Sequence, residues 1–184
     1  MFSPQLAVEG VNIKPPAQSF DETSFFKMSK SNGGSSSGVS KAVEEAAEVN
    51  NGKIFTTGKT QWTATRPKGT QQTYDVYQRN DIDWDMIRTS GNKNFIGKTN
   101  ARAAEKGLAP QLSDGNFAAL HHIGQDSRGA LAEASTRYHG VGKYGQDILH
   151  SQYGRSTPNP NFPIDRSKFG VDTREYWKWR VMNK

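Results

Sequence analysis

The chain has 184 residues, a formal net charge of +6, a hydrophobic content of 33% and no cysteine. The absence of cysteine excludes disulfides and thiolate metal sites, which leaves histidines and carboxylates as possible metal ligands. The sequence contains no run of about 18 apolar residues, so we expect no membrane span.

Residues 1–52 are expected to form a largely flexible linker. Pro15-Pro16 opposes regular structure, and Ser29–Gly38 is a low-complexity tract rich in Gly and Ser. Ser40–Val49 has a helical pattern that Asn50-Asn51-Gly52 ends. We therefore place the folded domain at residues 53–184.

The first part of this domain is predicted to contain strands. Tyr74–Tyr77 alternates between aromatic or apolar and other residues, and Ile54-Phe55 is a candidate start for a second strand. Asp81–Asp85 is acidic, and we favour a solvated strand end or turn over a cation site there.

A second organised block begins near residue 97. Either Thr99 or Asn100 is predicted to cap a short helix that runs to Lys106, and Gly107 is predicted to end it. Asp114-Gly115 is a turn signal.

The remaining elements follow that turn. Phe117–Ile123 is predicted to be a strand, whereas Ala130–Ser135 is compatible with either a strand or a helix. Short helical pieces are expected around His139 and over 146–151. A final helix is predicted over Thr173–Met182, opened by Asp172-x-x-Glu175.

The four histidines and the excess positive charge share one half of the chain. Residues 1–89 hold 10 Lys/Arg and 10 Asp/Glu, whereas residues 90–184 hold 14 Lys/Arg and 8 Asp/Glu together with every histidine. A basic surface beside grouped histidines favours a polyanionic substrate, with nucleic acid the first choice. A merely solubilising charge is the alternative.

His121 and His122 are adjacent within a predicted strand, so their side chains should point to opposite faces. We therefore expect one of them to bind a metal ion and the other to act as a base. Ordinary histidines satisfied by hydrogen bonds are the alternative interpretation. One divalent ion, a neutral imidazole and several cations are the groups that phosphodiester hydrolysis requires.

A run of motifs makes the interpretation more specific. The chain resembles the LHH clade of the HNH/endonuclease VII nuclease superfamily in a series of residues: Asn100, Gly107-Leu108-Ala109-Pro110, Asp114-Gly115 and Leu120–Gln125 (LHHIGQ), followed by His139 and Leu149-His150. The resemblance covers residues 95–155 or so. It implies an α+β fold with a ββα-metal core, in which a β-hairpin and a helix hold one divalent ion.

The resemblance also implies roles for individual residues. His121, His139 and His150 would be metal ligands, and His122 would be the general base, although the roles of His121 and His122 are open to exchange. Gln125 matches the family signature and would orient the site or contact phosphate, with a structural turn role as the alternative.

Basic residues near these histidines are candidates for contacts with a nucleic-acid backbone. Three flank the histidine cluster and three lie on the predicted terminal helix: Arg128, Arg137 and Lys143, and Arg174, Lys178 and Arg180. None of them resembles a base-reading motif, so we expect little sequence specificity.

The resemblance therefore predicts a metal-dependent endonuclease toxin that hydrolyses DNA and is used in interbacterial competition. The metal is left open among Mg²⁺, Mn²⁺, Ni²⁺ and Zn²⁺. The implied partners are DNA, a cognate immunity protein and an N-terminal delivery module, with residues 1–52 as a pretoxin segment. The producer would secrete the toxin, which would act in the cytoplasm of the target bacterium. The alternatives are a ribonuclease of the same fold and a non-catalytic, zinc-stabilised nucleic-acid-binding module.

Overall fold

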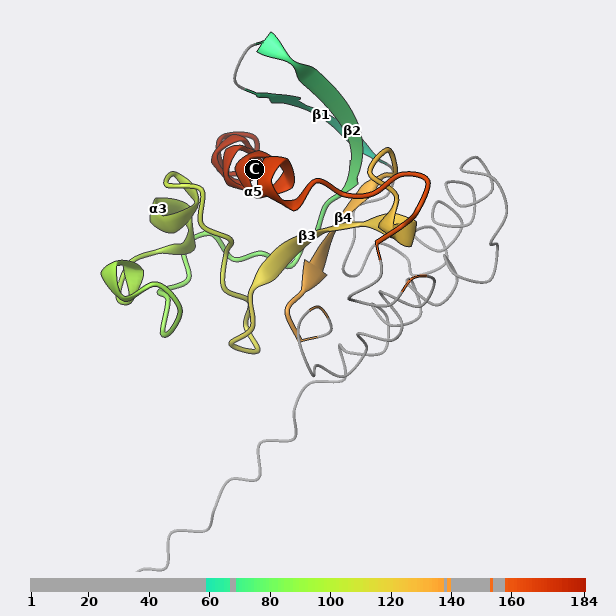
Figure 1. The fold of residues 1–184 in the computed structure, drawn as a ribbon. Helices are drawn as coiled ribbons and strands as arrows, with labels where there is room; N and C mark the ends of the chain where they lie inside the picture. The colour runs from blue at the N-terminus through green and yellow to red at the C-terminus, as the bar shows by residue number, and fades with distance from the viewer. Residues whose placement is uncertain (1–58, 67–68, 138, 140–152, 154–157) are drawn as a thin grey trace, which may run out of the picture.

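The computed structural model describes residues 59–66, 69–137, 139, 153 and 158–184, and in this part of the chain one long helix lies against a mixed sheet (Figure 1). The helix that we predicted over Ser40–Val49, the strand at Ile54-Phe55 and the helical piece over 146–151 lie outside the described residues. The α+β fold class is confirmed.

The sheet joins two antiparallel hairpins. Its strand order is β1 (Thr60–Thr65), β2 (Gln71–Tyr77), β4 (Leu131–Ser135) and β3 (Ala118–His122). β1 pairs with β2 and β3 pairs with β4, while a short parallel contact between β2 and β4 connects the two hairpins. The strand predicted from Tyr74–Tyr77 is confirmed, and Ala130–Ser135 is resolved in favour of a strand.

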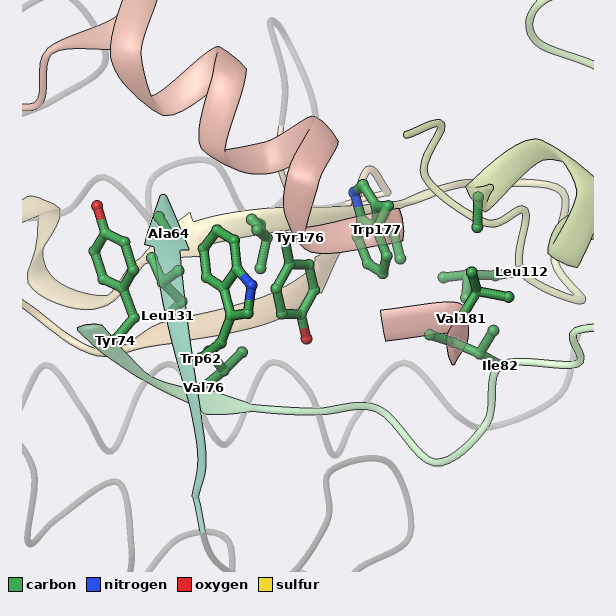
Figure 2. Packing of buried hydrophobic residues seen from close by; sticks show 13 residues of the cluster. Trp62, Ala64, Tyr74, Val76, Ile82, Leu112, Leu131, Tyr176, Trp177 and Val181 are labelled. Atoms are coloured by element: carbon green, nitrogen blue, oxygen red, sulfur yellow. The ribbon is translucent and has the colours of Figure 1, made fainter. Parts of the chain in front are cut away.

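Aromatic side chains fill the space between the sheet and α5 (Arg166–Met182). The Trp62 ring meets the Tyr176 ring edge to face, with centroids 5.1 Å apart, and Tyr176 and Trp177 are fully buried (Figure 2). Because large aromatics remove the most apolar surface from water, they dominate the stability of this interface.

Glu133 on β4 ties the sheet to α5 through a buried polar network. It accepts hydrogen bonds from the Tyr176 hydroxyl, from Nε of Arg180 at 2.9 Å and from the backbone N–H of Arg79. Burial raises the pKa of the Glu133 carboxyl, while the nearby Arg180 charge acts in the opposite direction. The network is costly to break because Glu133 is completely buried. Loss of any one partner would leave another buried polar group without a hydrogen bond.

The short helix α3 (Asn100–Ala104) follows a 3-10 turn, η2 (Lys93–Phe95). Thr99, the first of the two candidates, caps α3 by accepting a hydrogen bond from the backbone N–H of Arg102 at 3.2 Å. Gly107 ends the helical region with φ +77, and a Cβ there would lie 2.8 Å from the carbonyl oxygen of Arg174 on α5. Both sequence signals therefore act as predicted, and the second also allows α3 to approach α5 closely.

The start of α5 differs from the prediction. The helix begins at Arg166 rather than Thr173, and Asp165 caps it by accepting hydrogen bonds from the backbone N–H groups of Ser167 and Lys168. Asp172 is not a cap. It lies inside the helix, where its buried carboxylate binds Arg66, so the predicted capping box is wrong.

Candidate active site

The histidine pair lies at the end of β3, where the β3–β4 hairpin turns. His121 is opposite Ala132 and His122 is opposite Leu131 in the antiparallel register. The chain then enters a 3-10 turn, η3 (Ile123–Gln125), with Gly124 and Gln125 both at positive φ. The prediction of a strand through both histidines is confirmed, so their side chains alternate between the two faces.

His121 lies next to His139. The two imidazole rings are 5.0 Å apart between centroids and are inclined at 65°, and His121 is only 5% exposed. His139 follows β4, and its backbone N–H donates to the carbonyl oxygen of Ser135 at 3.0 Å. The fold thus brings together two of the three predicted metal ligands, while His150 lies outside the described residues.

His122 has different surroundings. Its ring lies 4.1 Å from the Phe169 ring and 5.7 Å from the Tyr74 ring, between centroids, and the residue is 2% exposed. Neither ring nitrogen has a hydrogen-bond partner among the described residues. Burial lowers the pKa of His122 to about 4, although the charges of Asp172 and Asp126 oppose this shift. The imidazole is therefore neutral near pH 7.

A cavity of about 280 Å³ opens beside His122. Its wall combines the hairpin connection, the strand β2 and the start of α5, and its lining residues are Arg66, Gln72, Tyr74, His122, Ser127, Arg128, Pro163, Ile164, Asp165, Lys168 and Phe169. Three of these are cations and one is a carboxylate. A neutral imidazole with unpaired nitrogens in a basic cavity is suited to proton transfer near an anionic group.

Each cation of the cavity is held by a carboxylate. Arg66 pairs with Asp172 at 2.6 Å, while Arg128 pairs with Asp126 at 2.8 Å. Lys168 pairs with Asp165 at 3.0 Å, but both of these side chains are at least half exposed, so this pair fixes Lys168 weakly.

The predicted backbone-binding cations are dispersed. Arg128 lines the cavity and stacks its guanidinium over the Phe162 ring. Arg137 does not line the cavity, and its Nη1 lies 3.9 Å from Oδ2 of Asp114. Lys143 lies outside the described residues.

The three cations of α5 differ in exposure. Arg174 is exposed, and Lys178 is partly exposed beside Glu175. Arg180 is 7% exposed and donates to Glu133 and to the backbone carbonyl of Arg79. The position of Arg180 thus departs from the expected nucleic-acid contact, because its charge is neutralised inside the domain.

Gln125 is 7% exposed and is not among the residues that line the cavity. Its side-chain Oε1 accepts a hydrogen bond from the backbone N–H of Tyr153 at 3.2 Å, and its backbone has φ 54. These contacts favour the structural alternative for Gln125, in which it fixes the hairpin connection relative to a distant part of the chain.

Several cavity residues had no signal in the sequence. Arg66, Gln72 and Phe169 line the cavity beside His122 from segments remote in the chain, and nothing in their local pattern distinguishes them from surface residues. Tyr74 was identified only as a strand residue. Their role depends on tertiary contacts, which periodicity does not report.

Among the described residues, the candidate donors for a divalent ion are the imidazoles on the His121 side. The two neighbouring imidazoles of His121 and His139 are a suitable pair of donors for a transition metal. Within the part of the chain that the structure describes, however, no group of three or more His, Asp or Glu side chains is assembled for an ion. A third ligand would therefore have to come from elsewhere, and His150 remains the predicted one.

Comparison with known families agrees with the histidine pattern. Residues 99–183 match the model of a family described as a nuclease of the HNH/ENDO VII superfamily with conserved LHH. In this chain that pattern is Leu120-His121-His122. No curated protein and no solved structure matches the chain. No helix in the described ranges has both the length and the apolar character needed to cross a bilayer.

Proposed function

We propose, from the membership of residues 99–183 in the HNH/ENDO VII nuclease superfamily, that this protein is a metal-dependent endonuclease with His122 as its general base. The observation that carries the proposal is the state of His122. It is buried and neutral, both ring nitrogens lack partners among the described residues, and it lines a cavity with three cations. A satisfied structural histidine would have a hydrogen-bond partner for at least one nitrogen.

In this mechanism a phosphodiester lies across the end of the β3–β4 hairpin, with its phosphate facing the cavity. The neutral His122 imidazole accepts a proton from the attacking water as the new P–O bond forms and the bond to the leaving oxygen breaks. Arg128 and Lys168 at the cavity wall offset the negative charge that develops on the phosphate. A base with a low pKa remains available in weakly acidic solution, at some cost in intrinsic basicity.

His121 and His139, with His150, would hold the divalent ion. A bound ion would supply Lewis-acid stabilisation of the phosphate and of the leaving oxygen. Because His121 and His122 alternate on β3, the ligand and the base are supplied by opposite faces of one strand end. The substrate phosphate must therefore lie at that end, beside the hairpin connection, to meet both.

We take DNA as the preferred substrate and RNA as the second candidate, with little sequence dependence in either case. The cavity contacts that favour a phosphate do not read bases, so they do not distinguish the two polymers. Incubation of the protein with plasmid DNA and with total RNA, with each divalent metal and with EDTA, separates the possibilities. Intact polymers with every metal would reject the nuclease and leave a non-catalytic binding module.

We further propose that the enzyme is a toxin in interbacterial competition, secreted by its producer, active in the cytoplasm of the target bacterium and neutralised by a cognate immunity protein. The support is the resemblance of the LHH motifs to toxin nucleases and the excess of positive charge in residues 90–184. Induced expression in a bacterial cytoplasm should stop growth and degrade nucleic acid, whereas His122→Ala should not. Normal growth with the active protein present at the same level would reject this role.

A further inference from the structure

Arg66 extends from the end of β1 to the α5 helix and to the cavity beside His122. Nε and Nη2 donate to the Asp172 carboxylate, the shortest contact being 2.6 Å, and Nη2 also donates to Gln72 Oε1 at 2.8 Å and to the Tyr74 hydroxyl at 3.0 Å. Asp172 is 1% exposed. The guanidinium is therefore held in one orientation by three side chains before any ligand arrives.

The same contacts connect Arg66 to the base. Tyr74, whose hydroxyl accepts from Arg66, packs edge to face against the His122 ring. Both Arg66 and His122 line the cavity, and the Arg66 side chain retains 17% exposure. Nη1 donates no hydrogen bond among the described residues, so this N–H₂ group is available to an anion in the cavity.

The β1–β2 hairpin is also attached to the hairpin that holds the histidines. The Gln72 side chain donates from Nε2 to the backbone carbonyl of Ser127 at 2.9 Å, next to Arg128 in the β3–β4 connection. β1 and β2 precede the family-matched residues, which start at 99. The cavity is thus assembled from the matched region and from a hairpin outside it.

We propose that Arg66 binds a non-bridging oxygen of the phosphodiester attacked at His122, and that the β1–β2 hairpin is consequently part of the substrate site. This inference rests on the proposed nuclease function. A planar guanidinium suits a phosphate better than an ammonium does, because it offers several N–H groups in a fixed fork. Asp172 positions Arg66 and does not itself face the substrate.

The first test uses the full chain and the variants Arg66→Gln and Arg66→Lys. Arg102→Gln is the matched control, because Arg102 lies on α3, has a side chain that is 71% exposed, and forms an ion pair with Glu105 on the same surface. We expect kcat/KM for plasmid cleavage to fall by about 100-fold in Arg66→Gln, the loss typical of one transition-state donor. Arg102→Gln should leave it unchanged.

A second readout separates phosphate contact from structural support. Binding of a fluorescent duplex is measured in EDTA between about 50 and 200 mM salt, where each phosphate contact contributes about 0.9 to the slope of log K against log salt. The slope should decrease by that amount in Arg66→Gln and stay unchanged in Arg66→Lys. Arg66→Lys should nevertheless cleave more slowly than the wild type, because an ammonium cannot reproduce the fork.

Thermal unfolding of each variant shows which results can be interpreted. A folded Arg66→Gln with the wild-type slope and wild-type kcat/KM would make Arg66 a structural residue and overturn the inference while leaving the nuclease intact. If Arg66→Gln does not fold, the inference is tested by the cleavage rate of Arg66→Lys. Cleavage by that variant at the wild-type rate overturns the inference. Failure of the wild type to cleave or bind any polynucleotide would instead reject the proposed function itself.

Discussion

The His121 and His139 rings lie edge to face with centroids 5.0 Å apart, although the whole of β4 separates them in the chain. Neighbouring imidazoles at this distance are a suitable start for a transition-metal site. The pair therefore distinguishes His121 from His122, whose ring contacts Phe169 and Tyr74 instead.

Removal of either ring of the pair should weaken metal binding. We expect His121→Ala and His139→Ala each to lower the affinity for Zn²⁺ or Ni²⁺ by more than about 10–100-fold. A loss of that size is already typical when a residue that only hydrogen-bonds to a metal ligand is replaced. Isothermal titration calorimetry of the metal-free protein measures this directly. Phe95→Ala serves as a control, because Phe95 is a partly buried residue of η2 and belongs to neither β3 nor β4. Wild-type affinity in both histidine variants would place the ion elsewhere.

The complementary prediction concerns His122. His122→Ala should reduce kcat for phosphodiester cleavage by about 10²–10⁴-fold, the usual contribution of a positioned acid or base. Its metal affinity should stay close to that of the wild type, because its ring packs against Phe169 and Tyr74 rather than forming part of the His121–His139 pair. Full activity in a folded His122→Ala protein would refute the role of His122 as base.

The burial of His122 also predicts how stability depends on pH. The folded-state pKa is lowered from 6.5 to about 4, so the folded protein binds fewer protons than the unfolded chain between these values. The stabilisation is fully present above pH 6.5 and is lost as the pH falls through 4, with a total of about 3 kcal/mol. Urea unfolding in EDTA, near neutral pH and at about pH 4.5, measures the loss.

His122→Leu is the matched variant for this experiment, because leucine keeps an apolar side chain beside Phe169 without a titrating group. The difference in unfolding free energy between neutral and acidic pH should be smaller in His122→Leu than in the wild type. Equal losses in the two proteins would show that other groups cause the acid sensitivity.

Arg180 and Arg174 should respond differently to substitution, although both lie on α5. Arg180→Met leaves the fully buried Glu133 without its main cation, so we expect a destabilisation of about 3–5 kcal/mol. Arg174→Met, at an exposed position, should change stability by less than about 0.5 kcal/mol. Chemical unfolding measures both. Replacing Glu133 by Gln in the Arg180→Met background should restore part of the loss, and a mild Arg180→Met effect would contradict the network.

Gly107 should tolerate alanine less well than Gly115 does. Both have positive φ, at +77 and +84, so each substitution carries a similar backbone cost. A Cβ at Gly107 would also meet Arg174 backbone and side-chain atoms at 2.8 and 2.9 Å, whereas nothing lies within 4 Å at Gly115. We expect Gly107→Ala to be less stable than Gly115→Ala by about 1–3 kcal/mol, the usual cost of overpacking. Equal melting temperatures would show that α3 and α5 separate easily.

The sequence determined the local features of this protein. The alternation around Tyr74, a cap at Thr99 or Asn100, the stop at Gly107 and the strand through His121 and His122 were all predictable, because each depends on backbone preferences within a few residues. The misplaced start of α5 has the same origin. Asp172 looks like a cap locally, and only its contact with Arg66 shows that it is a buried partner.

Tertiary structure alone decided which histidine has which neighbours. Alternation along β3 required the side chains of His121 and His122 to lie on opposite faces. It did not predict that His121 would lie beside His139, or that His122 would lie beside Phe169. The sequence pattern also gave no indication that Arg66, at the end of β1, would line the cavity, or that the Arg180 side chain would be buried. The positions of Phe169, Arg66 and Arg180 come from the packing of α5 on the sheet, where burial and charge pairing between remote segments outweigh any local pattern.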